Sequence, residues 1–177
     1  MINMKKYLLL GISLLLALCS CGEKRVYRPS LFPDQQSASR YSFAIPYVEK
    51  NGAIVVRVRL NGGPQFEGTW DSGCSVPLKI TSLEATALIK DGTLSESDFR
   101  QSVPITVANG QSSNYAVYML KSISFVDEDG LEHTLTQIPA VIDDNVSTDI
   151  LIGLPVMQAL GNSHEISQVD QSIFFKD

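Results

Sequence analysis

The chain has 177 residues, with 14 lysines and arginines against 19 aspartates and glutamates, which gives a formal net charge of −5. It has no basic patch and no cluster of lysines interleaved with aromatic residues, so we do not expect nucleic acid as a partner.

The first 20 residues have the layout of a secretory signal. Lys5 and Lys6 precede an uncharged, apolar run over residues 7–18. The run is shorter than the ~18 to 20 residues that a helix needs to cross a bilayer. A charged start followed by a short hydrophobic region is typical of an exported protein.

A cysteine follows this run in a sequence that resembles a bacterial lipobox. Ser20 supplies the small residue that should stand directly before the modified cysteine, Cys21. The resemblance implies cleavage before Cys21 and lipidation of its sulfur and amino group. We therefore expect residues 1–20 to be a lipoprotein signal peptide. The mature chain is then anchored by lipid in the bacterial cell envelope, at the outer membrane or a periplasmic face; an ordinary cleaved signal and an uncleaved apolar anchor are the alternatives.

Cleavage at this point changes the charge and the cysteine count. It removes two lysines and no acidic residue, so the net charge falls from −5 to −7. Cys19 leaves with the signal and Cys21 carries lipid, so Cys74 is the one remaining thiol. A disulfide cannot form within one mature chain, and we expect Cys74 to be buried.

The rest of the chain divides into a tether and a single domain. Residues 21–40 lack hydrophobic periodicity and are typical of a flexible linker. Residues 41–177 are numerous enough for one domain with its own core. Alternating apolar residues and turn sequences predict strands over 54–60, 66–70, 103–107, 115–120, 122–126, 131–135, 140–142, 149–153 and 172–175. Helices are predicted over 82–90, with Ser82 as its cap and Leu83, Ala87 and Leu88 on one face, and over 154–160.

The candidate catalytic residue is Asp71, in the sequence Asp71-Ser72-Gly73-Cys74-Ser75 directly after a predicted strand. A carboxylate activates water when it is held rigidly beside a second group that shares its proton. The Ser72 hydroxyl is available to hold the loop, and Gly73 allows its backbone N–H to approach the carboxylate. Alone, Asp-Ser-Gly is also a common turn.

Two later segments give this triplet a context. Ala108, Asn109, Gly110 and Gln111 form an Asn-Gly turn between two predicted strands, which indicates a hairpin. Further on, an aliphatic block runs directly into the second predicted helix; its residues are Ile150, Leu151, Ile152 and Gly153.

The order of these three segments resembles the retropepsin-like aspartic proteases, including bacterial single-domain members. The resemblance implies a mainly β fold class: a retropepsin-like acid-protease barrel with one or two short helices, half of a pepsin-like bilobal fold. It implies that Asp71 is catalytic and that residues 72–75 form the active-site loop. It also implies that residues 108–111 form the flap over the substrate and that residues 150–153 support the site structurally.

The implied function is an aspartic endopeptidase that acts on a peptide or protein substrate without a metal or an organic cofactor. Because the chain has a single Asp-Ser-Gly, a homodimer must bring two copies of Asp71 together. Ser72 and Cys74 replace the usual threonine and alanine, and we expect the bulky Trp70 to narrow the site. The alternative is an inactive, protease-like module for peptide binding or assembly on the envelope.

Other candidate chemistry in the sequence is weaker. A Cys74 nucleophile needs a basic histidine, but His133 is expected on an exposed strand and His164 in a loop. Two separated histidines give no metal signature. The acidic segment 127–130 is predicted to be a solvated hairpin turn rather than a calcium loop.

Asp143 and Asp144 form a second acidic pair in the sequence. No motif surrounds them, so we expect them to lie in a loop where they serve solubility.

Overall fold

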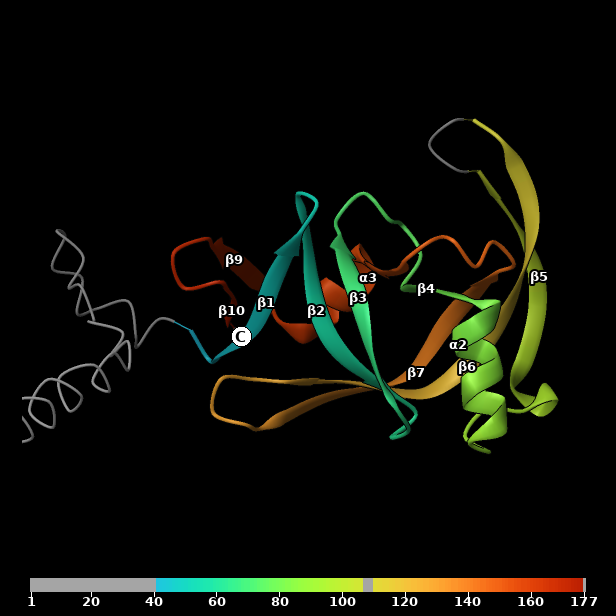
Figure 1. Cartoon of the computed structure of the whole chain (residues 1–177), viewed down its shortest axis with the longest axis horizontal. Coiled ribbons are helices and arrows are strands. Elements are labelled where there is room, and N and C mark those ends of the chain that lie inside the picture. Colours follow the sequence, from blue (N-terminus) through green and yellow to red (C-terminus); the bar gives the residue numbers. More distant parts are fainter. Residues whose placement is uncertain (1–40, 107–109, 177) are drawn as a thin grey trace, which may run out of the picture. The chain divides into compact units, whose positions relative to one another are not determined.

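A computed structural model of the protein describes residues 41–106 and 110–176. The predicted signal peptide, the tether and Cys21 lie outside these residues. The described part is mainly β, as predicted (Figure 1). Its strands are β1 (Phe43–Lys50), β2 (Ala53–Leu60), β3 (Gln65–Asp71), β4 (Leu78–Thr81), β5 (Phe99–Thr106), β6 (Ser112–Val126), β7 (Glu132–Asp143), β8 (Ile150–Gly153), β9 (Ser163–Ser167) and β10 (Ser172–Lys176). Its helices are α2 (Ser82–Lys90), the short 3-10 helix η1 (Glu96–Asp98) and α3 (Leu154–Leu160).

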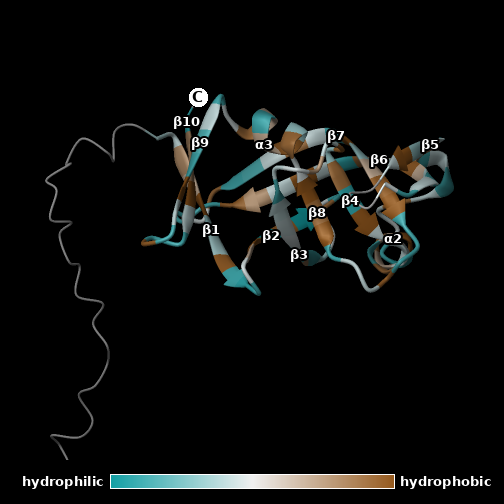
Figure 2. Cartoon of the chain, turned by 90° about the horizontal axis from the view of Figure 1, so that it is seen from above, coloured by the Kyte–Doolittle hydropathy of each residue, from teal (hydrophilic) through white to brown (hydrophobic). Residues whose placement is uncertain are grey.

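Six of the strands close into a barrel. Their order is β6-β7-β4-β8-β3-β2, and β2 pairs back onto β6. Alternating side chains point inward and fill the barrel, since a barrel of this size has no room for a channel. The ribbon of β8 is hydrophobic along its length (Figure 2). The largest fully buried side chains include Leu60, Leu78, Ile80, Ile123, Phe125, Ile152, Met157 and Phe175.

Four strands extend the sheet beyond the barrel. On one side β5 pairs with β6 as a long hairpin. On the other side β1, β10 and β9 follow β2 in that order. Strand β1 serves two neighbours, because residues 43–46 pair with β10 and residues 47–50 pair with β2.

Parallel pairings in the middle of the sheet bring together segments that are distant in sequence. Strand β3 runs parallel to β8, with Asp71 opposite Gly153. Strand β4 runs parallel to β7, with Thr81 opposite Asp143. The first pairing places the predicted catalytic loop beside the late aliphatic block, and the second places the end of β4 beside the end of β7.

Helix α2 has the predicted bounds but a different cap and a different buried face. Thr81, not Ser82, is the N-cap, because Glu84 stands at the third helical position and completes a capping box with the Thr81 side chain and backbone. Ala85 and Leu88 are buried, whereas Leu83 is 58% exposed.

The prediction that residues 127–130 form a solvated turn is wrong for Asp127, whose side chain is buried. Its side chain is only 4% exposed and accepts hydrogen bonds from the backbone N–H groups of Asp129 and Leu131. Nε2 of His133 lies 2.8 Å from Asp127 Oδ2. The His133 ring stacks on Phe43 with 3.7 Å between ring centroids, so His133 is a packed residue rather than an exposed one.

Strands β1, β4 and β9 were not predicted. Strand β9 contains His164, which the sequence places in a loop. No helix of the described residues has the length and hydrophobicity needed to cross a membrane.

Candidate active site

Asp71 is the last residue of β3 and lies beside Gly153, the last residue of β8. Successive side chains on a strand point to opposite faces. Trp70 points into the core, with 7% of its surface exposed, and Asp71 is therefore directed away from the core and is partly exposed.

The loop after Asp71 folds back onto its carboxylate. The backbone N–H of Gly73 donates to Asp71 Oδ1 at 2.9 Å, and the N–H of Cys74 donates to the Asp71 carbonyl at 3.1 Å. A Cβ atom at position 73 would lie 3.2 Å from Asp71 Oδ1, which is tighter than an ordinary contact. The backbone thus holds the carboxylate in one orientation.

Ser72 does not hold the loop in the way we expected. Its side chain is exposed, and no hydrogen bond within the described residues involves its hydroxyl. Ser75 is also exposed. The conformation of the loop rests on backbone hydrogen bonds instead.

The aliphatic block at residues 150–153 holds this loop in place through backbone hydrogen bonds. The N–H of Gly153 donates to the Pro77 carbonyl at 3.0 Å, and the N–H of Leu154 donates to the Cys74 carbonyl at 3.0 Å. Residues 150–153 form β8, and Ile150 and Ile152 are buried. The block and the Asp71 loop are therefore one interlocked unit.

The predicted flap is a hairpin of β5 and β6. The paired ends are Thr106 and Ser112, whose hydroxyl oxygens lie 2.7 Å apart. Gly110 has φ of 83°, a left-handed conformation that suits glycine in a turn. Gln111 follows it and is exposed, while Ala108 and Asn109 lie outside the described residues.

Comparison with known proteins adds one result. No protein-family model and no curated protein matches the chain. Among solved structures, a retropepsin-like aspartic protease from Rickettsia conorii matches with a TM-score of 0.52 and 15% sequence identity; the match covers 74% of this chain and 87% of that one.

The chain has a retropepsin-like fold. At this identity the match establishes the fold and not the activity. It agrees with the six-stranded barrel and the two α-helices of the described residues. The resemblance to the family that the sequence indicates is thus confirmed at the level of the fold.

Cys74 is not placed to act as a nucleophile in this retropepsin-like fold. Burial raises the pKa of its thiol, and the negative charge of Asp71 raises the pKa further. The sulfur lies 3.6 Å from the Val76 carbonyl oxygen. His133 is engaged by Asp127, and His164 packs against Trp70 and Phe175, so neither histidine serves Cys74 as a base.

The expectation that Trp70 narrows the site is wrong. Its ring is buried in the hydrophobic core and meets Phe125, Phe175 and His164 edge-on, at centroid distances of 6.3, 5.9 and 5.9 Å. The bulk of the side chain therefore lies on the core side of β3. Its Nε1 atom is the one buried side-chain nitrogen or oxygen without a hydrogen bond in the described part of the chain.

Metal ligands do not gather anywhere in residues 41–106 and 110–176: no group of three or more histidine, cysteine, aspartate or glutamate side chains lies close enough to hold an ion. The groups that the structure brings together around Asp71 are therefore backbone amides, a neutral thiol and exposed hydroxyls.

Proposed function

We propose that the protein is an aspartic endopeptidase whose active site forms between two copies of the chain, each supplying Asp71. The observation that carries the proposal is the fixed Asp71 carboxylate, which is oriented by the Gly73 N–H and locked in place by Gly153. The hydrogen bond from Gly73 alone is typical of a turn, since Asp127 and Asp143 accept in the same way; what distinguishes Asp71 is that its loop is also held against β8. The retropepsin-like fold supports the same assignment.

The chemistry requires a second carboxylate. Two carboxylates about 3 Å apart share one proton, so that one is the base and the other the acid. The ionised Asp71 takes a proton from water as the water oxygen bonds to the peptide carbonyl carbon, and the protonated Asp71 gives its proton to the carbonyl oxygen. Transfer of a proton to the amide nitrogen then lets the C–N bond break. Because Asp-Ser-Gly occurs once in the sequence, a homodimer supplies the pair.

The exposed Ser72 hydroxyl fits this arrangement. It lies next to Asp71 and has no hydrogen bond within the described residues of its own chain. In a homodimer it is available to bond across the two-fold axis and hold the two loops together. The hairpin of β5 and β6 then covers an extended peptide and excludes water.

Lipidation at Cys21 is part of the proposal. A lipid-anchored chain in the cell envelope, at the outer membrane or a periplasmic face, meets other chains on a surface rather than in three dimensions. Confinement raises the effective concentration of the second copy and favours the dimer. Mass spectrometry of the N-terminal peptide from envelope membranes tests the lipid directly.

Peptide cleavage by the full chain in detergent tests the function. Asp71→Asn should lower the rate by roughly 100-fold or more, the scale of a lost general acid–base group. Asp129→Asn removes the same charge from an exposed turn residue and serves as the matched control. Binding of peptides without any cleavage by the unaltered protein would favour an inactive, peptide-binding module instead.

Mixing experiments test the shared site. When Asp71→Asn and unaltered chains are mixed in varying proportions at a constant total concentration, mixed dimers form and are inactive. The rate should then fall as the square of the unaltered fraction. A linear fall means that each chain carries a complete site, which contradicts the proposal.

A further inference from the structure

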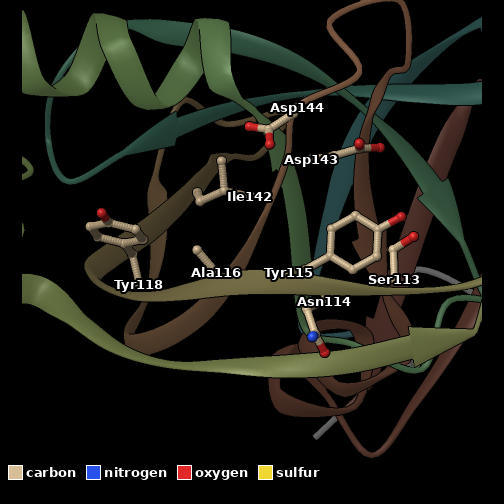
Figure 3. A pocket seen from close by; sticks show the side chains of 8 residues that line it. All are labelled: Ser113, Asn114, Tyr115, Ala116, Tyr118, Ile142, Asp143 and Asp144. Atoms are coloured by element: carbon tan, nitrogen blue, oxygen red, sulfur yellow. The ribbon is translucent and has the colours of Figure 1, made fainter.

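A pocket of about 430 Å³ lies where β6 and β7 separate (Figure 3). The last paired residues of these strands are Ala116 and Ile142. Beyond them β6 continues into the flap hairpin through Tyr115, whereas β7 ends at Asp143 and the chain turns toward β8. The fork between the two strands opens the pocket.

The lining of this pocket combines apolar surface with carboxylates. Tyr115 and Tyr118 stand on either side of Ala116 on β6, and Ile142 and Asp144 face them from the end of β7 (Figure 3). Neither tyrosine hydroxyl has a hydrogen bond within the described residues. The pocket therefore combines aromatic and aliphatic surface with the polar side chains of Ser113 and Asn114 and with negative charge.

The two carboxylates are not equivalent, contrary to the expectation that both serve solubility. Asp143 is 16% exposed, and its Oδ2 lies 3.3 Å from Lys79 Nζ and accepts from the Thr148 hydroxyl at 3.1 Å. Burial alone would raise the pKa of Asp143, but the Asn145 N–H and the Lys79 ammonium outweigh burial and lower it. Lys79 thus compensates the charge of Asp143.

Asp144 carries the uncompensated charge of the pocket. Its side chain is exposed, and no ion pair or hydrogen bond within residues 41–106 and 110–176 engages its carboxylate. The other charged residue of the lining, Asp143, is already paired with Lys79. The pocket as a whole is therefore negative.

We infer that this pocket binds the side chain of a lysine or arginine in the peptide substrate. The long aliphatic stem of such a residue packs on apolar surface while its charged head stays near the rim. A cation over the face of Tyr115 or Tyr118 gains further attraction from the ring. The Asp144 carboxylate then favours a cationic head and repels glutamate and aspartate. The inference rests on the proposed peptidase function, whose substrate class it defines.

The pocket lies at the base of the flap hairpin. Tyr115 of its lining stands on β6 and pairs with Val103 of β5 within that hairpin. Lys79, whose ammonium bridges Asp143 and Thr148, stands on β4, the strand that follows the Asp71 loop. In the proposed peptidase, a side chain of a peptide held under the flap can therefore enter the pocket.

Cleavage of three peptide pools by the full chain tests the inference. One pool carries lysine at the tested position, the second carries methionine and the third carries glutamate, and each position of the peptide is tested in turn. Methionine approximates the length of the lysine side chain without its charge. The kcat/KM for lysine peptides should exceed that for methionine peptides by about fivefold at one position, as an ion pair near a surface allows. Asp144→Asn should abolish this ratio, Asp144→Lys should shift the preference to glutamate, and Asp129→Asn should leave the ratio as it was.

Binding of the same pools to the Asp71→Asn chain separates this inference from the peptidase proposal, because binding needs no catalysis. Tighter binding of lysine peptides that weakens with salt and is lost in Asp71→Asn/Asp144→Asn supports the pocket even if no peptide is cleaved. In that case only the peptidase proposal fails. Equal binding of lysine, methionine and glutamate peptides overturns the inference, and so does a lysine preference that survives Asp144→Asn.

Discussion

The Gly153 backbone lies so close to the carbonyl of Val76 that a Cβ atom at position 153 would stand 1.9 Å from the Val76 oxygen. Its φ of −90° suits any residue, so the requirement for glycine is one of space and not of backbone conformation. The obstructing atom belongs to the backbone of the Asp71 loop and has no rotamer by which to move aside.

Gly153→Ala should therefore displace the Asp71 loop. We expect the free energy of unfolding to fall by about 3 kcal/mol or more, at the upper end of the cost of overpacking. Urea unfolding of the full chain measures this. Gly52→Ala is the matched control, because Gly52 has φ of 79° with nothing within 4 Å and should cost only about 1 kcal/mol. Equal losses in the two variants contradict the interlock.

The buried Asp127 should make stability depend on acid. Burial would raise the pKa of Asp127, but the hydrogen bonds from His133 and from the Leu131 N–H outweigh burial and lower it. A lowered pKa in the folded state gives stability that is present above about pH 4, the unfolded value, and is lost as pH falls further.

Asp127→Asn should flatten this acid dependence and lower the free energy of unfolding at pH 7 by about 2 kcal/mol, since bonds to a charged acceptor are lost. Urea midpoints between pH 3 and pH 7 provide the measurement. Asp129→Asn in the same turn should leave the acid dependence in place. A parallel pH profile in the Asp127→Asn chain is the outcome that rules the explanation out.

Cys74 should react slowly with alkylating reagents in the folded protein. The thiolate is the reactive form, and a thiol whose pKa is raised by burial has less of it at pH 8. Iodoacetamide labelling, located by mass spectrometry on the Cys74 peptide, should be about tenfold or more slower than in urea. The same raised pKa makes a contribution to stability that is fully present below about pH 9, the ordinary value, and is lost as pH rises through the folded pKa. Equal labelling rates in folded and unfolded protein would show that the thiol is not protected.

Trp70 should matter for stability and not for access to the site. Trp70→Leu leaves a cavity among Phe125, Phe175 and His164, and we expect a loss of about 3 kcal/mol. Trp70→Phe keeps an aromatic ring and removes the Nε1 donor that has no partner in the described residues, so it should cost less. If both variants cleaved peptides faster than the unaltered chain, the side chain would instead be an obstruction.

Local sequence patterns predicted the elements whose signals are local. The bounds of α2 follow from capping residues and helical periodicity, and the run of aliphatic residues over 150–152 predicts a buried strand. The cap was misplaced by one residue because Thr81 and Ser82 are both good caps, and only Glu84 decides between them.

Pairings between distant segments could not be predicted in this way. Strand β4 has four residues, and its partners β7 and β8 lie far along the chain, so its sequence alone carries too little pattern. For the same reason Asp143 looked like a solvated loop residue, although Lys79 reaches it across the parallel pairing of β4 and β7. The stacking of His133 on Phe43, in the distant strand β1, likewise could not be predicted from the hairpin sequence.

The parallel pairing of β3 with β8 determines when, during synthesis and folding, the Asp71 loop becomes ordered. During synthesis from the N-terminus, the residues of β3 and of the Asp71 loop are made long before those of β8. Contacts between segments that are distant in sequence also form slowly in folding. Until Gly153 is in place, the Asp71 loop lacks the hydrogen bonds that β8 and the start of α3 make with it. The carboxylate therefore acquires its fixed orientation only when nearly the whole domain is complete.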